Sequence, residues 1–60
     1  MPIVQIECLP RSLEQKRQVC TEITEIICRT LICKPEDVRI IIRDMQKENY
    51  SVAGKLYADK

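Results

Sequence analysis

Two short segments rich in β-branched residues enclose a longer segment with a different pattern. Residues 2–8 read PIVQIEC and residues 38–45 read VRIIIRDM. β-Branched side chains favour an extended backbone, so both segments are predicted to be strands. Pro2 can occupy the first position of its strand, where a missing N–H does little harm.

Between these segments, apolar residues recur at steps of three and four, which predicts one face of an amphipathic helix. The apolar positions that follow Leu13 are Val19, Cys20, Ile23, Ile26, Ile27 and Leu31. The opposite face is expected to be solvated and carries Glu14, Lys16, Arg17, Glu22, Glu25 and Arg29. Ser12 is the expected N-cap, with Gln15 at the capping-box position. We expect the helix to end near Ile32, because Pro35 restrains the residue before it.

The order strand, helix, strand predicts an α+β fold built on a single β-α-β unit with parallel strands. Residues 35–38 are expected to form a turn and residues 46–49 a loop. Residues 50–55, with Gly54, are predicted to form a short C-terminal hairpin arm, followed by a tail. We expect one domain over residues 1–60. Since parallel strands start at the same sheet edge, Pro2 and Arg39 should lie at one edge, and Arg11 and Tyr50 at the other.

Chain length and the hydrophobic run at residues 40–42 both favour an oligomer. A chain of 60 residues supports only a marginal core. Three consecutive isoleucines suggest that both faces of the sheet are covered. One helix covers one face, so a second subunit is the expected cover for the other.

The four cysteines are expected to be reduced, small apolar residues of a cytoplasmic protein, with a redox or metal role as the alternative. Cys8, Cys20, Cys28 and Cys33 form no CxxC pair of the kind found in zinc ribbons. The first residues lack the basic and apolar regions of a signal peptide. No apolar run approaches the length of a membrane span.

Composition narrows the chemistry further. The formal charge of +1 gives no reason to expect nucleic acid or an anionic membrane as a partner. The chain has no histidine, which excludes a His-based triad and a His general base.

Three segments of the chain resemble the 4-oxalocrotonate tautomerase family. They are MPIVQIE at the start, RSLEQKRQVCTEIT over residues 11–24, and PEDVRIIIRDMQKENYSVAGK over residues 35–55. The resemblance implies a homo-oligomer, most commonly a hexamer arranged as a trimer of dimers, with sites built from different subunits. It implies an isomerase for small 2-hydroxydienoate or enol carboxylic acids that needs neither cofactor nor metal.

The same resemblance implies roles for four residues. Pro2 matches the proline that becomes the amino terminus and acts as general base. Arg39 matches the arginine that binds and polarises the substrate carbonyl or carboxylate, and Arg11 the arginine that binds the far carboxylate. Tyr50 stands where the family usually has a pocket-lining phenylalanine.

The chain also departs from the family pattern. The stretch before Arg11 is one residue shorter than in the typical member, and the arm has Ser51 and Ala53 where three glycines are usual in this region. Met1 must be removed, because an amide nitrogen at Pro2 has no useful basicity. The alternative hypothesis is an inactive, tautomerase-like oligomeric binding protein that retains Met1.

Overall fold

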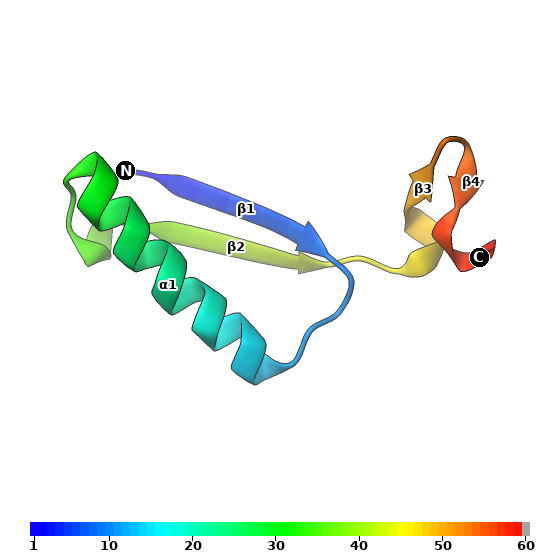
Figure 1. The fold of residues 1–60 in the computed structure, drawn as a ribbon, viewed down its shortest axis with the longest axis horizontal. Helices are drawn as coiled ribbons and strands as arrows, with labels where there is room; N and C mark the ends of the chain where they lie inside the picture. The colour runs from blue at the N-terminus through cyan, green and yellow to red at the C-terminus, as the bar shows by residue number, and fades with distance from the viewer. Residues whose placement is uncertain (60) are drawn as a thin grey trace.

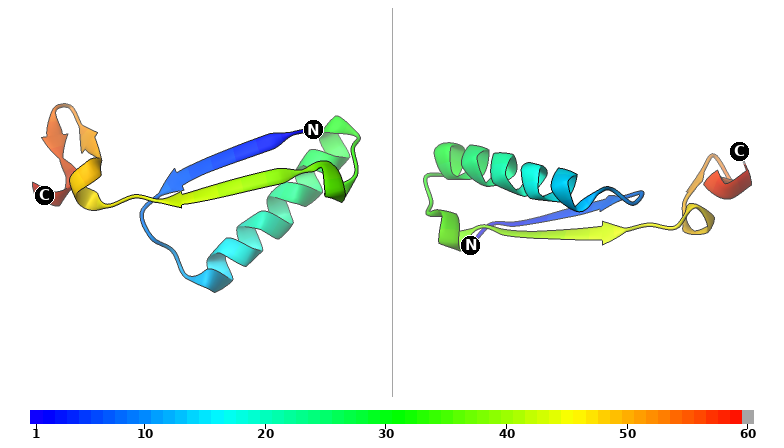
Figure 2. Two further views of the ribbon diagram at one scale, coloured as in Figure 1. Left: turned by 180° about the vertical axis from the view of Figure 1, so that it is seen from behind. Right: turned by 90° about the horizontal axis from the view of Figure 1, so that it is seen from below.

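The fold is a two-stranded parallel sheet with one helix packed on one of its faces. The computed structural model describes residues 1–59. Strands β1 (Ile3–Cys8) and β2 (Arg39–Asp44) pair in parallel, and helix α1 (Leu13–Leu31) connects them. Figure 1 shows the helix crossing the sheet, and Figure 2 shows that the opposite sheet face is open. The predicted α+β architecture with a β-α-β unit is confirmed.

The start of α1 follows the predicted capping box. The Ser12 hydroxyl accepts a hydrogen bond from the Gln15 N–H at 3.1 Å, and the Gln15 side chain accepts one from the Ser12 N–H at 3.1 Å. These bonds satisfy two backbone donors that have no partner within the helix. The helix ends at Leu31, and Ile32 adopts the left-handed conformation with φ 54°. The expected end is therefore confirmed to within one residue.

The contact between α1 and the sheet is narrower than the sequence pattern predicted. The half-buried helix residues include Cys20, Ile23 and Ile27. Ile26 and Leu31 were expected on the same face, but their exposed fractions are 50% and 59%. A straight helix touches a sheet along one stripe, so apolar residues at the side of that stripe keep their contact with solvent.

The two faces of the sheet differ sharply in their cover. Side chains alternate along a strand, so Val4, Ile6, Ile40 and Ile42 share the half-buried face under α1. The open face has Ile3 and Ile41, with exposed fractions of 55% and 40%. None of the hydrophobic side chains in residues 1–59 is fully buried. Cover of the open face by a second subunit stays a prediction.

Lys16 was expected on the solvated face of the helix, and this prediction was wrong. Its Nζ lies 3.0 Å from a carboxylate oxygen of Asp44, and its side chain is only 28% exposed. Lys16 is one turn before Cys20, so it lies in line with the packing stripe. The ion pair connects the first turns of α1 to the end of β2.

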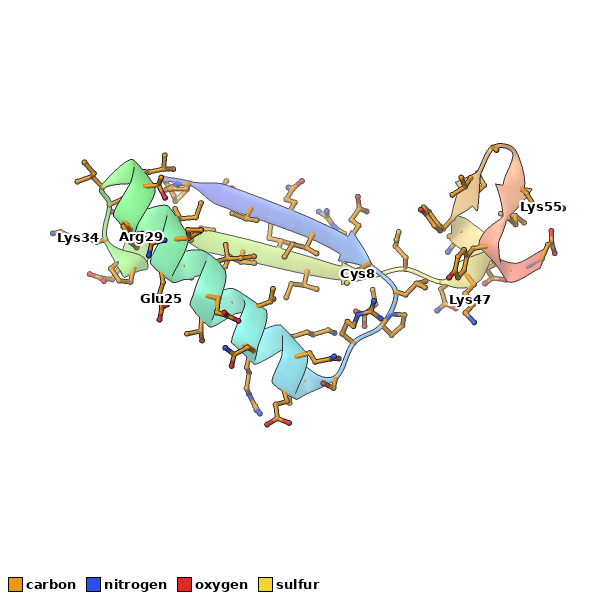
Figure 3. The ribbon with its side chains drawn as sticks, viewed as in Figure 1. Cys8, Glu25, Arg29, Lys34, Lys47 and Lys55 are labelled. Atoms are coloured by element: carbon orange, nitrogen blue, oxygen red, sulfur yellow. The ribbon has the colours of Figure 1, made fainter. Side chains whose placement is uncertain are left out.

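Beyond β2 the chain forms the arm that the sequence predicted. A short 3₁₀ helix (Lys47–Asn49) leads into the antiparallel strands β3 (Ser51–Val52) and β4 (Lys55–Leu56). The loop residues Ala53 and Gly54 have φ 54° and 80°, as a type I′ turn requires. Figure 3 shows Lys47 and Lys55 in this arm, well separated from Cys8 at the end of β1.

The residues expected to form a tail have secondary structure as far as Asp59. Leu56 belongs to β4, a 3₁₀ turn spans Tyr57–Asp59, and the remainder of the tail, Lys60, lies outside the described residues. The expected turn at residues 35–38 is a 3₁₀ turn over Pro35–Asp37.

Candidate functional site

Pro2 and Arg39 lie together at the edge where both strands begin. The Arg39 N–H donates to the Pro2 carbonyl at 3.0 Å, and Ile3 is the register partner of Arg39. Pro2 is half-buried, and Met1 before it is 77% exposed. The expected proximity of Pro2 and Arg39 is therefore confirmed at the level of the backbone.

The side chain of Arg39 is held by the turn that precedes β2. Its Nη1 donates to the Glu36 carbonyl at 2.5 Å. A guanidinium has five N–H donors, so this bond leaves others available for an oxygen ligand. Sequence reasoning missed the role of the Glu36 carbonyl, since a backbone acceptor gives no signal in the residue type.

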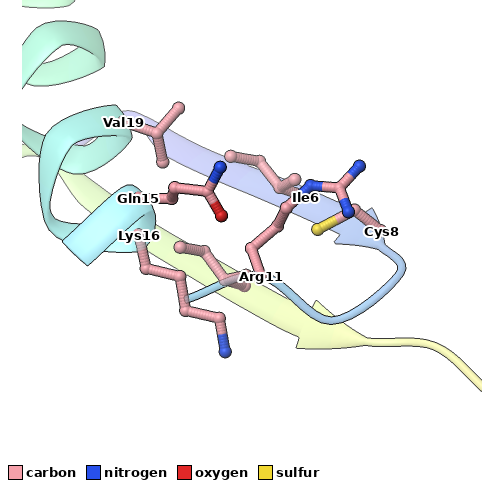
Figure 4. Close-up of a pocket in the computed structure, with 7 residues that line it drawn as sticks. Ile6, Cys8, Arg11, Gln15, Lys16 and Val19 are labelled. Carbon is pink, nitrogen blue, oxygen red and sulfur yellow. The ribbon is translucent and has the colours of Figure 1, made fainter. Parts of the chain in front are cut away.

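A hollow of about 230 Å³ lies at the opposite edge, where the strands end. Its polar wall is formed by Arg11, Gln15 and Lys16, as Figure 4 shows. The remaining lining is Ile6, Cys8, Val19 and Ile42. Lys16 is already paired with Asp44, which leaves Arg11 as the cation of this wall without a carboxylate partner among the described residues. A guanidinium above an apolar surface suits a carboxylate on a short hydrocarbon chain, because the charge and the carbon skeleton each meet a matching surface.

The chain does not bring Arg11 to Pro2. Figure 1 shows the amino terminus at one end of the sheet and the connection from β1 to α1 at the other. Pro2 does not line the hollow that Arg11 helps to form. Tyr50 follows β2 and lies in the arm, so it also belongs to the strand-end side.

Tyr50 is buttressed by a second aromatic ring. The centroids of the Tyr50 and Tyr57 rings are 5.7 Å apart, with their planes tilted by 49°. The Tyr57 N–H also donates to the Tyr50 carbonyl at 2.7 Å. The 3₁₀ turn after β4 therefore fixes the base of the arm, where Tyr50 lies.

Gln15 and Lys16 are lining residues that sequence reasoning did not assign to a site. Gln15 was given a capping role alone, and Lys16 was placed in solvent. The only feature of the sequence that could have indicated a site role for them is their position, because both lie shortly after Arg11, at the start of α1. Only the packing of α1 on the sheet shows that these turns face a hollow.

The described residues contain no group that suggests a metal centre or a membrane span. Within residues 1–59, no three His, Cys, Asp or Glu side chains are clustered to hold a metal ion. Over the same residues, no helix has the length and apolar character needed to cross a bilayer.

Comparison with known proteins gives a family for this arrangement. The family model for tautomerase enzymes matches residues 2–60. The chain belongs to the tautomerase family. It is 39% identical to a probable tautomerase of Halalkalibacterium halodurans over 61 positions that cover both proteins fully.

Two further tautomerase relatives carry more specific names. A 2-hydroxymuconate tautomerase of Bacillus subtilis is 37% identical, over 98% of this chain and 97% of that protein. A solved structure from a study of 4-oxalocrotonate tautomerase isozymes of Methylibium petroleiphilum is 44% identical. It superposes with a TM-score of 0.92 over 97% of this chain and 92% of that one. These relatives support a tautomerase function.

Proposed function

We propose that the protein is a cofactor-independent tautomerase that converts small 2-hydroxydienoate or enol carboxylic acids to their keto isomers. The observation that carries this proposal is the pairing of Pro2 and Arg39 at one sheet edge through a 3.0 Å backbone hydrogen bond. Pro2, the potential base, and Arg39, a permanent cation, therefore belong to the starts of neighbouring strands of one chain. The similarity to a protein named 2-hydroxymuconate tautomerase supports the substrate class.

Pro2 acts as the general base once Met1 has been removed. Its nitrogen takes a proton from the substrate hydroxyl and returns one to carbon, which is a 1,3- or 1,5-proton shift. An α-amino group has a pKa of about 7.7–8.0. A secondary amine such as that of proline is more basic. Desolvation in a closed site and an adjacent arginine both disfavour the cation and so lower the pKa. The absence of histidine is therefore compatible with acid–base catalysis near neutral pH.

The arginines provide charge at two positions on the substrate. Arg39 stabilises the oxygen on which negative charge develops, and an arginine is suited to this because it stays charged. Arg11 binds the distal carboxylate, with Gln15 and Lys16 beside it. Tyr50 lines the apolar part of the site.

A complete site requires more than one copy of the chain. Pro2 and Arg11 lie at opposite edges of one sheet, so a substrate that contacts both lies between subunits. The open sheet face, which includes Ile3 and Ile41, is a surface that assembly would cover. We propose a homo-oligomer of single-domain chains, a hexamer arranged as a trimer of dimers, in the cytoplasm.

The direct test is the rate of enol-to-keto conversion of a 2-hydroxydienoate, or of phenylenolpyruvate, by native protein and by Pro2→Ala. We expect kcat to fall by about a hundred- to ten-thousandfold, which is the usual contribution of a positioned general base. The intact mass of each preparation must show that Met1 is absent. Equal rates for the two proteins would remove any special role of proline as the base, because the substitution keeps a free amino group at this position. Native material that retains Met1 would favour the binding-protein alternative.

A further inference from the structure

The end of helix α1 brings two cysteines together. In a continuous helix, residues five apart point in directions that differ by about 140°. Here the left-handed Ile32, with φ 54° and ψ 67°, reverses the chain after Leu31. The N–H groups of both Ile32 and Cys33 consequently donate to the Cys28 carbonyl, the latter at 3.3 Å.

This arrangement has a defined side-chain consequence. The bond from the Cys33 N–H to the Cys28 carbonyl spans six residues, as in a Schellman motif. The side chains of the two residues joined by that bond commonly contact each other. In this protein both residues are cysteines, and both are free and half-buried.

The electrostatics of Cys28 agree with this placement beside Cys33. Partial desolvation raises the pKa of the Cys28 thiol, and the neighbouring Cys33, through charge and a side-chain hydrogen bond, raises it further. The carboxylates of Asp37 and Glu36 act in the same direction. The backbone bond of 3.3 Å between Cys33 and Cys28, with the side-chain contact typical of this cap, places the two cysteines next to each other. A disulfide requires neighbouring cysteines of this kind.

We propose that Cys28 and Cys33 are a redox-modification site that closes reversibly to an intrachain disulfide across the C-terminal cap of α1. The oxidant is a low-molecular-mass disulfide of the glutathione type. Transient disulfides of this kind are the form in which cytosolic proteins use cysteine oxidation. This inference does not depend on the proposed function.

The reaction proceeds by two thiol–disulfide exchanges. The Cys33 thiolate attacks one sulfur of the oxidant, which forms a mixed disulfide and releases one small thiolate. The Cys28 thiolate then attacks the Cys33 sulfur, which forms the protein disulfide and releases the second small thiolate. The two cysteines lose two electrons and two protons in total, and the oxidant becomes two thiols.

The disulfide would lie on the path from α1 to the candidate site. Cys33 leads into the turn at Pro35–Asp37, where the Asp37 N–H donates to the Lys34 carbonyl at 2.9 Å. The Glu36 carbonyl of that turn accepts from Arg39. A cross-link at the helix cap therefore fixes the start of the segment that holds Arg39.

The test is to incubate the full-length native protein with oxidised glutathione and to measure its intact mass under non-reducing conditions. The variant Cys8→Ser/Cys20→Ser is treated in parallel, since it retains only the proposed pair. Trypsin places the two cysteines in separate peptides, residues 18–29 and 30–39, so the bond can be mapped directly. Cys28→Ser and Cys33→Ser are the matched negative variants.

We expect the native protein and the double variant each to lose the mass of two hydrogen atoms, without a glutathione adduct. Peptides 18–29 and 30–39 of the double variant should be joined, and dithiothreitol should restore the original mass. Cys33→Ser and Cys28→Ser should not lose these hydrogens. In the double variant, a stable glutathione adduct, a bond between chains, or an unreacted pair would each overturn the proposal. Because the double variant keeps both cap cysteines, its result does not depend on a substitution that could disturb the cap.

Discussion

The two edges of the sheet carry different functional groups. At the strand-start edge, Pro2 and Arg39 are joined by a backbone hydrogen bond, and the turn at residues 35–37 holds the arginine. At the strand-end edge, Arg11 and Lys16 flank an apolar hollow. One edge thus has the candidate base, and the other has a shaped surface for a substrate. If Pro2 and Arg11 act on one substrate, as proposed, each chain contributes half of two different sites, and the reaction depends on assembly.

The largest effect among the further predictions is expected at the strand-start edge. Arg39→Ala should lower kcat by about a hundred- to a thousandfold, the usual effect of removing one group that stabilises a developing oxyanion. Steady-state kinetics of enol ketonisation measure this. Arg29→Ala, on the exposed side of α1, is the matched control and should keep the native kcat. A native kcat in Arg39→Ala would separate Arg39 from the reaction.

A smaller effect of another kind is expected at the strand-end edge. Arg11→Ala should raise KM by about ten- to a hundredfold, because a hydrogen bond to a charged group contributes about 1.5–3 kcal/mol. The change in kcat should be much smaller than for Arg39→Ala. Arg17→Ala, which removes an exposed cation from the nearby first turns of α1, should leave KM unaltered. If Arg11→Ala and Arg39→Ala changed kcat and KM in the same way, the two edges would not have the different roles proposed here.

The smallest effect is expected in the arm beyond the strand-end edge. Ala53→Gly should raise the free energy of unfolding by about 1 kcal/mol or less, since glycine relieves the left-handed strain but is more flexible when unfolded. Gly54→Ala should lower it by about 1 kcal/mol. A Cβ at Gly54 meets open space, so this loss reflects the backbone alone. Urea unfolding at one fixed protomer concentration measures both, because dissociation makes stability concentration-dependent.

Local features of the fold were predictable from the sequence, whereas the rotation of the helix was not. The capping box at Ser12 and Gln15 depends on neighbouring residues, and the sequence contains both partners. The exposure of Ile26 and the partial burial of Lys16 depend on which side of α1 meets the sheet. Residue hydrophobicity alone placed Ile26 inside and Lys16 in solvent, whereas the packing leaves Ile26 half exposed and Lys16 half-buried.

The candidate site was predictable only as far as chain topology determines it. Parallel strands place Pro2 and Arg39 at one edge and Arg11 at the other, and the structure confirms that placement. The hollow beside Arg11 is lined by Val19 of α1 together with Ile6 and Ile42 of the sheet, and no local sequence pattern shows that these residues come together. The left-handed conformation at the end of α1 was also not predictable from the sequence, because Ile32 is a β-branched residue at a position where glycine is usual.

We propose that a working site combines Pro2 of one chain with Arg11 of another. Mixed oligomers of Pro2→Ala and Arg11→Ala would show whether it does. The two chains would be co-expressed with different tags and purified through both tags. They would be assayed against each parent variant at substrate concentrations well below the native KM, where Arg11→Ala is also slow. If the site lies between chains and the subunits mix at random, about a quarter of the sites contain both native residues, so about a quarter of native activity should return. Activity no higher than that of the parent variants would contradict the account, because it would mean that both residues must come from one chain.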